Sequence, residues 1–211
     1  MTARTQENGP APRASMLARL RERLRYRRYL RAQIRQSRAK RAKDASFRLV
    51  PFVDLIRSEC SDLALEAPVL CIGARNEVEL DVFRQAGFTD VLAIDLWSAS
   101  PRIRVGDMHA LPFPDGAFAL VFASHVFEHA WDFSRVAAEC IRVLRPDGYL
   151  FCAVPTGFLP SEHDRYDFKD AKGVLAYFAA WPVRLVAEHH LRPGELSLLL
   201  RRESAAGEGT R

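Results

Sequence analysis

Two residues that end consecutive apolar runs have the types and the spacing of a nucleotide-binding site. The run Val-Leu-Cys-Ile is followed by Gly73, and 22 residues later Asp95 closes the next run. Glycine lets the backbone approach a ligand closely, and an acid at this spacing is placed to accept hydrogen bonds from ribose hydroxyls. The helix expected after Gly73 would also present free N–H groups to a carboxylate or phosphate. Together these residues predict a site for a nucleoside-containing ligand.

A second set of side chains has the chemistry to move a proton. His125, Glu128 and His129 lie in Ser-His-Val-Phe-Glu-His, and His163 and Tyr166 lie in Ser-Glu-His-Asp-Arg-Tyr-Asp-Phe. A base is needed when the reacting group is a hydroxyl or a protonated amine, because its proton must be removed. We predict that His125 faces the reacting group that loses its proton; alternatively, His125 only braces its loop. His129 is expected to pack at the start of the next helix. Their spacing fits no metal-binding signature, so no metal is expected.

The apolar pattern indicates which elements position these residues. Strands are predicted at 69–73, 91–95, 119–125 and 148–155 and just before Asp107, helices at 77–87, 132–144 and 169–180, and a closing antiparallel pair at 183–191 and 195–203. Continuous apolar strands that alternate with helices are typical of a parallel sheet covered on both faces. The predicted fold class is therefore α/β: a Rossmann-like, doubly wound, mostly parallel sheet with an antiparallel C-terminal hairpin. Ligands bind such sheets at the carboxyl ends of the strands.

The helix after Gly73 has a start signal of its own. Asn76 is followed three residues later by Glu79, which is the arrangement of a capping box. We therefore expect the Asn76 side chain to cap the first turn of this helix.

The charge of the 211-residue chain is unevenly distributed. Residues 1–48 hold 15 Lys and Arg against 3 acids, whereas residues 49–211 hold 16 against 23. The mildly acidic globular part argues against a nucleic-acid groove there. The four cysteines include no Cys-x-x-Cys pair and indicate reduced, mostly buried thiols. No run reaches the length of a membrane span, so a cytoplasmic protein is expected.

Composition divides the chain into three segments. Residues 1–45 are predicted to be a basic, partly disordered and partly helical extension, 46–203 the folded domain, and 204–211 a disordered tail. The extension has a loose apolar arc formed by Leu17, Leu20, Leu24, Leu30 and Ile34, which arginines interrupt on nearly every face. Three interpretations stay open: a solvated basic helix, contact of residues 16–43 with an anionic partner such as RNA or a membrane surface, and an organellar targeting peptide.

From about Val69 to Arg202 the chain resembles class I S-adenosylmethionine-dependent methyltransferases, most of all the small-molecule group often called type 11. The matching stretches are VLCIG, AIDL, GDMHALPFPDGAFALVF, SHVFEHAWD and RVLRPDGYLFCAVP, in the order of the family. The resemblance implies S-adenosylmethionine as the cofactor. The implied cofactor-binding residues are Gly73, Ala74, Arg75, Asp95, Leu96, Asp107, Met108 and Ser124, with Asp95 on the ribose and Asp107 and Met108 near the adenine.

The chain departs from the family pattern in its first motif. Cys71 stands where the family usually has an acid, and Arg75 and Glu77 stand where it has further glycines. We therefore expect Arg75 to pair with the cofactor carboxylate and Glu77 to meet its ammonium group. The segment between Asp95 and the third strand is too short for the usual crossover helix, so the sheet is expected to be trimmed on one face.

The sequence thus predicts a methyltransferase that acts by in-line transfer to an O or N acceptor on a small molecule or a glycan precursor. The catalytic candidates are His125, His163 and Tyr166. One alternative is an RNA or protein methyltransferase recruited by the basic tail, although no Asn/Asp-Pro-Pro-Tyr/Phe stretch follows the fourth strand. The other is a degenerate protein that only binds the cofactor, which the altered first motif favours.

Overall fold

A seven-stranded sheet organises the computed structural model, which describes residues 16–204 of the chain. The strands are β1 (Val69–Ile72), β2 (Val91–Asp95), β3 (Ile103–Val105), β4 (Phe118–Ser124), β5 (Leu144–Pro155), β6 (Val183–His189) and β7 (Glu195–Arg202). Their order in the sheet is β3-β2-β1-β4-β5-β7-β6. The first five are parallel, and β7 is antiparallel to both of its neighbours. The predicted fold class is confirmed.

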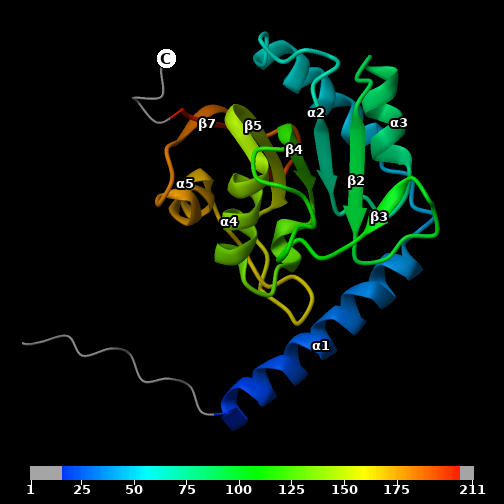
Figure 1. Ribbon diagram of the computed structural model, residues 1–211, viewed down its shortest axis with the longest axis vertical. Helices are drawn as coiled ribbons and strands as arrows, with labels where there is room; N and C mark the ends of the chain where they lie inside the picture. The colour runs from blue at the N-terminus through cyan, green and yellow to red at the C-terminus, as the bar shows by residue number, and fades with distance from the viewer. Residues whose placement is uncertain (1–15, 205–211) are drawn as a thin grey trace, which may run out of the picture.

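Helices cover both faces of the sheet. They are α1 (Met16–Ala39), α2 (Ser46–Glu59), α3 (Val78–Gln85), α4 (Phe133–Val143) and α5 (Ala171–Leu175), with 3₁₀ turns η1 (Phe127–His129) and η2 (Ala176–Phe178). α2 and α3 pack on one face, and α4 and α5 pack on the other (Figure 1). Alternate strand residues point to opposite faces, so Cys71 belongs to the first core and Leu70 to the second.

The structure meets the expectations about the cysteines and the trimmed sheet, and it divides one predicted helix. All four cysteines are buried and free. No helix connects β2 to β3 across residues 96–102, so the sheet is trimmed on that side as predicted. The predicted helix at 169–180 is split into α5 and η2, and it begins where the Asp170 side chain accepts a hydrogen bond from the Gly173 N–H at 2.8 Å.

Only the Asn76 half of the capping box predicted at Asn76 and Glu79 forms. α3 begins at Val78, whose N–H donates to Asn76 Oδ1 at 3.3 Å, and the Asn76 amide donates to the backbone carbonyls of Arg41 and Lys43. Glu79 is buried, and burial raises its pKa to about 8. The carboxyl group is therefore turned into the protein instead of back to the start of the helix.

Helix α1 lies across the carboxyl end of the sheet, toward which the β2 arrow points in Figure 1. The predicted apolar arc is not the side that packs, because Leu17, Leu20 and Leu24 are 68%, 52% and 49% exposed. The packed side is formed by residues three or four apart, namely Tyr26, Tyr29, Gln33 and Ser37. The surface that α1 meets is the polar rim of the sheet, so polar side chains with partners there are buried. No helix within residues 16–204 has the length and apolarity to cross a bilayer.

Candidate functional site

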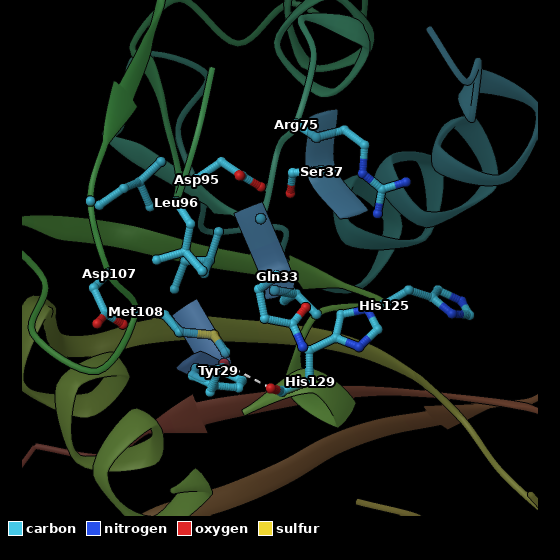
Figure 2. A pocket seen from close by; sticks show the side chains of 15 residues that line it. Tyr29, Gln33, Ser37, Arg75, Asp95, Leu96, Asp107, Met108, His125 and His129 are labelled. Carbon is cyan, nitrogen blue, oxygen red and sulfur yellow. Dashed lines mark hydrogen bonds between the residues drawn. The ribbon is translucent and has the colours of Figure 1, made fainter. Parts of the chain in front are cut away.

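A pocket lies between the carboxyl ends of the first four strands and the inner side of α1 (Figure 2). The sheet side carries Gly73, Asp95 and Asp107, which follow or end β1, β2 and β3. Tyr29, Gln33 and Ser37 of α1 form the opposite wall. The space left between the two walls is about 50 Å³, whereas ligand pockets measure about 300–1,000 Å³. With the side chains as they stand, this space is too small for a ligand of nucleoside size.

The structure brings most of the predicted site residues together. The pocket is lined by Gly73, Arg75, Asp95, Leu96, Asp107, Met108 and His125. Ala74 is buried next to Gly73 but does not line the pocket, and the Ser124 hydroxyl is buried without a hydrogen-bond partner among the described residues. His163 and Tyr166 also lie outside the lining. Their proposed roles therefore depend on a neighbouring acceptor region.

Gly73 exposes bare backbone to the pocket. Its φ angle is +84°, in the left-handed region that favours glycine, and an added Cβ would lie 2.6 Å from Val126 Cγ2. Its N–H donates to the carbonyl of Ile94 at 2.8 Å, which ties the turn to the end of β2. Only glycine fits this position without displacing Val126.

Asp95 presents its carboxylate to α1 from the end of β2. One oxygen accepts the Trp97 N–H at 3.0 Å, and the Ser37 hydroxyl of α1 hydrogen-bonds the same carboxylate, which it faces in Figure 2. Burial raises the Asp95 pKa, and these two hydrogen bonds oppose that rise. The carboxylate therefore keeps hydrogen-bond acceptor capacity on the pocket side.

Asp107 is held by a network that includes a histidine which sequence reasoning missed. His109 Nδ1 lies 2.7 Å from Asp107 Oδ1, and the His109 Nε2 accepts the N–H groups of Trp131 and Asp132 at 3.0 and 3.3 Å. The His109 proton therefore sits on Nδ1 and points to Asp107. The Tyr26 hydroxyl of α1 donates to the other Asp107 oxygen. Burial alone would raise the Asp107 pKa, but these hydrogen bonds lower it.

His125 has a partner that the sequence did not suggest. Its Nε2 lies 2.7 Å from Glu195 Oε2 at the start of β7, and its Nδ1 lies 3.9 Å from Glu128 Oε1. Figure 2 shows the His125 imidazole on the side of the pocket away from Asp95 and Asp107. Burial raises the pKa of Glu128 to about 8. An imidazole thus stands between two buried carboxyl groups.

The loop that contains His163 is fastened to the turn after β4. His129 Nδ1 contacts the His163 carbonyl at 3.1 Å and Asp164 Oδ1 at 2.9 Å, and burial lowers the His129 pKa against the effect of Asp164. The Tyr166 hydroxyl accepts the Phe133 N–H at 3.2 Å, at the start of α4. The prediction that His129 packs at the next helix is therefore wrong: His129 is the last residue of η1 and lines the pocket beside Gln33 (Figure 2). Residues 16–204 contain no cluster of three or more His, Cys, Asp or Glu that could hold a metal.

Helix α1 is attached to this region by hydrogen bonds. The Tyr29 hydroxyl donates to the His129 carbonyl at 2.8 Å, and the Gln33 amide donates to the His163 carbonyl at 3.3 Å. Near the outer end of the helix, the Trp131 indole donates to Glu22 at 3.2 Å. The rings of Tyr26 and Tyr29 also pack against His109 and Trp131, so α1 is held by both polar and aromatic contacts.

Comparison with known proteins identifies what this arrangement is similar to. Residues 70–152 match a family described as methyltransferase domain. A probable S-adenosylmethionine-dependent methyltransferase from Mycolicibacterium smegmatis is 30% identical over 104 residues, which cover 48% of this chain and 38% of that protein. A malonyl-(acyl-carrier protein) O-methyltransferase from Coxiella burnetii is 30% identical over 152 residues, covering 64% and 53%. The chain thus spans less than two thirds of either relative.

A solved structure extends the likeness to nearly the whole chain. The 1,6-didemethyltoxoflavin-N1-methyltransferase of Burkholderia thailandensis, solved with bound 1,6-didemethyltoxoflavin and S-adenosylhomocysteine, superposes with a TM-score of 0.65. The match covers 93% of this chain and 94% of that chain at 15% sequence identity. At this identity the likeness concerns the fold.

The buried carboxyl group of Glu128 predicts a pH-dependent stability. Its pKa of about 8 in the folded chain exceeds that of an unfolded glutamate, so its contribution is present at low pH and is lost as the pH rises toward about 8. Glu128→Gln removes this loss, which is on the order of a few kcal/mol because one pKa unit corresponds to about 1.4 kcal/mol. Urea unfolding at several pH values from acidic to alkaline measures it.

The control for this experiment is Glu66→Gln, which alters an exposed glutamate. Its unfolding free energy should equal that of the wild type at every pH. Both proteins keep Glu79, so both curves include the pH dependence that this second buried glutamate contributes. Parallel curves for Glu128→Gln and the wild type would show that Glu128 is not protonated in the folded chain.

Proposed function

Because the chain carries a class I, S-adenosylmethionine-dependent methyltransferase domain, we propose that it transfers a methyl group to an oxygen or nitrogen atom of a small molecule or a glycan precursor. One observation carries the proposal: Gly73, Asp95 and Asp107 come from three different strand ends and line one pocket. These are the positions at which a nucleoside-containing cofactor meets a parallel sheet.

The residues of the pocket fit this cofactor. The bare backbone at Gly73 would face its methionine end, with Arg75 near the carboxylate, while Asp95 would accept hydrogen bonds from the ribose and Asp107 would lie at the adenine edge beside Met108. Bound S-adenosylmethionine supplies a methyl group on a positively charged sulfur, so the chain mainly has to align the acceptor and exclude water.

The ammonium contact predicted for Glu77 is not part of this proposal. Glu77 bonds to the Ser100 hydroxyl and to Arg102, and it lines a neighbouring groove instead of the pocket. Its carboxylate is therefore already occupied by partners in the connection between β2 and β3.

The acceptor side of the proposal rests on the turn after β4. His125 lines the pocket, and His163 and Tyr166 belong to the loop that is hydrogen-bonded to the same turn. The names of the similar proteins include an O-methyltransferase and an N1-methyltransferase, which supports oxygen and nitrogen as acceptor atoms. Four free, buried thiols fit a reducing compartment, and we propose the cytoplasm.

Replacement of Asp95 tests the proposed cofactor site. Asp95→Ala removes the carboxylate that would accept hydrogen bonds from the ribose. Its loss should weaken the binding of S-adenosylhomocysteine by at least about tenfold, because a hydrogen bond to a charged group contributes about 1.5–3 kcal/mol. Isothermal titration calorimetry measures the affinity. Asp90→Ala, which alters an exposed aspartate just before β2, should bind as the wild type does. No binding by the wild type, or no difference between the two variants, contradicts the proposal.

Helix α1 occupies hydrogen-bonding positions that the cofactor would need. Tyr26 donates to Asp107, and Ser37 hydrogen-bonds to Asp95, so their hydroxyl groups compete with those of a bound nucleoside. The small space beneath α1 leads to the same conclusion. We therefore propose that α1 moves away from the sheet before the cofactor binds.

Removal of one competing hydroxyl group should strengthen binding. Tyr26→Phe frees an Asp107 oxygen, and we expect S-adenosylhomocysteine to bind several-fold more tightly, since one net hydrogen bond contributes about 0.5–1.5 kcal/mol. Calorimetry on the full-length chain measures the change. Tyr177→Phe is the matched control, because Tyr177 packs against Phe133 and Phe168 and does not line the pocket. Weaker binding by Tyr26→Phe would mean that α1 is part of the cofactor site instead of a competitor.

The outer side of α1 favours a second function, the recruitment of an anionic partner such as RNA or a membrane surface to residues 16–43. α1 contains nine arginines, and among the described residues none of them makes an ion pair with an acid. Arg31 and Arg35 are exposed on the side away from the pocket. An RNA or protein methyltransferase would use such a surface to hold its substrate.

Salt-dependent RNA binding tests this second function. The full chain is titrated with a single-stranded RNA at several salt concentrations, and the slope of log K against log salt is compared among variants. Arg31→Gln with Arg35→Gln should reduce the slope by about 0.7 for each phosphate group that is no longer neutralised. Arg57→Gln with Arg145→Gln removes the same charge from other exposed positions and should leave the slope unchanged. Equal slopes in both double variants contradict recruitment by α1.

The remaining alternative is a protein that binds the cofactor but transfers no methyl group. Cofactor binding without turnover across a panel of acceptors would indicate it.

A further inference from the structure

We propose that Glu195 positions His125 as the base that removes the proton from the methyl acceptor, which makes the acceptor a hydroxyl or a protonated amine. This inference rests on the proposed methyl transfer and names the side of the pocket at which the acceptor binds. It depends on the conformation of His125, the burial of Glu195 and the free nitrogen of the imidazole.

The backbone of His125 is held in an uncommon conformation. Its φ angle is +51°, in the left-handed region that few residues other than glycine occupy. Its N–H donates to the Ala153 carbonyl at 2.8 Å, so the conformation is fixed to the neighbouring strand β5. Residues held in this region are strained and cluster at functional sites. His125 lines the pocket, and its imidazole extends from there to the start of β7, where Nε2 meets Glu195 (Figure 2).

Glu195 reaches His125 because β7 runs antiparallel to its neighbours. The first residue of an antiparallel strand lies at the same edge as the last residue of the adjacent parallel strand, and Glu195 pairs with Pro155 at the end of β5. The Glu195 side chain is 5% exposed. Its Oε2 contacts His125 Nε2 at 2.7 Å, and its Oε1 has no hydrogen-bond partner among the described residues. The imidazole is therefore the side-chain group that this buried carboxylate binds.

The contact with Glu195 determines which nitrogen of His125 carries the proton. A carboxylate can only accept hydrogen bonds, so the proton of the neutral imidazole sits on Nε2 and the lone pair remains on Nδ1. Nδ1 lies 3.9 Å from Glu128 Oε1, which is too long for a hydrogen bond. The basic nitrogen is therefore not bonded to this neighbour and can accept a proton from a bound molecule.

The proton transfer balances without another reactant. The O–H or N–H bond of the acceptor breaks, a new N–H bond forms at His125 Nδ1, and the electron pair of the broken bond stays on the acceptor atom, which becomes a better nucleophile. The resulting imidazolium lies against the Glu195 carboxylate, which stabilises its charge. Histidine and carboxylate pairs of this kind position the ring and favour the correct tautomer.

Other titratable groups near His125 and Glu195 come from η1, from α2 and from the turn after β1. Glu128 of η1 faces Nδ1 and is uncharged near neutral pH, because burial raises its pKa to about 8. Arg48 of α2 interacts electrostatically with Glu195 and Glu128, and Arg75 after β1 interacts with Glu128. Glu195 is therefore the carboxylate in direct contact with the imidazole.

Imidazole ¹⁵N NMR on the full-length chain tests the positioning. Two-dimensional spectra at neutral pH distinguish the Nε2-protonated from the Nδ1-protonated tautomer, and the signals of His125 are assigned by their loss in His125→Asn. The wild type should show the Nε2-protonated tautomer alone. Glu195→Gln keeps the shape of the side chain but can donate as well as accept, so its spectrum should show a mixture. Glu188→Gln changes an exposed glutamate of β6 that contacts His190, and it should leave the His125 signals unchanged.

Calorimetry with S-adenosylhomocysteine on the same samples separates this inference from the proposed function. Glu195→Gln should bind it within about twofold of the wild type, because Glu195 does not line the pocket beside Asp95. The positioning role would be overturned if His125 of the wild type is protonated on Nδ1. It would also be overturned if Glu195→Gln shows the Nε2-protonated tautomer alone, as the wild type should. Both conclusions hold even if the cofactor binds. Failure of the wild type to bind S-adenosylhomocysteine would overturn the methyl transfer while the tautomer result still describes the pair.

Discussion

The parallel direction of β1 to β5 is the constraint on which the site depends. Parallel strands place all their carboxyl ends at one edge, so Gly73, Asp95, Asp107 and His125 meet there although they are spread over more than fifty residues of sequence. The antiparallel strand β7 reverses this rule and brings its first residue, Glu195, to the same edge. Chain direction alone therefore gathers the acid that we propose binds the ribose, a bare backbone turn and a histidine with its carboxylate partner.

A second consequence of this edge is the kind of contact that α1 makes. The rim of the sheet is polar, so α1 is held by the hydroxyl groups of Tyr26, Tyr29 and Ser37 and the amide of Gln33, while Leu20 and its neighbours on that side stay exposed. A net hydrogen bond contributes about 0.5–1.5 kcal/mol and can be exchanged for one to water or to a ligand. A helix packed by an apolar stripe would leave the rim only by exposing that stripe to water. The packed side of α1 has no such stripe, and its apolar contacts are the rings of Tyr26 and Tyr29 against His109 and Trp131.

The sequence predicts those features of the fold and site that depend on short stretches of chain. Apolar runs identify the strands, and the residue after each run identifies the edge, which is why Gly73 and Asp95 could be assigned to one pocket. The Glu195 contact with His125 joins residues 70 positions apart, and the Tyr26 contact with Asp107 joins residues 81 positions apart, so no local pattern contains them. The apolar arc of α1 was misleading because hydrophobicity says which side of a helix avoids water, but not whether the surface it meets is apolar.

Buried acids around the pocket link its chemistry to ligand charge. Burial raises the pKa values of Glu79 and Glu128 to about 8 and also raises that of Asp95, because a charged group without a compensating partner is costly in the interior. Arg48 and Arg75 lower the Glu79 and Glu128 values only in part. A ligand with a positive charge that enters the pocket favours the ionised form of each acid, so its binding releases protons.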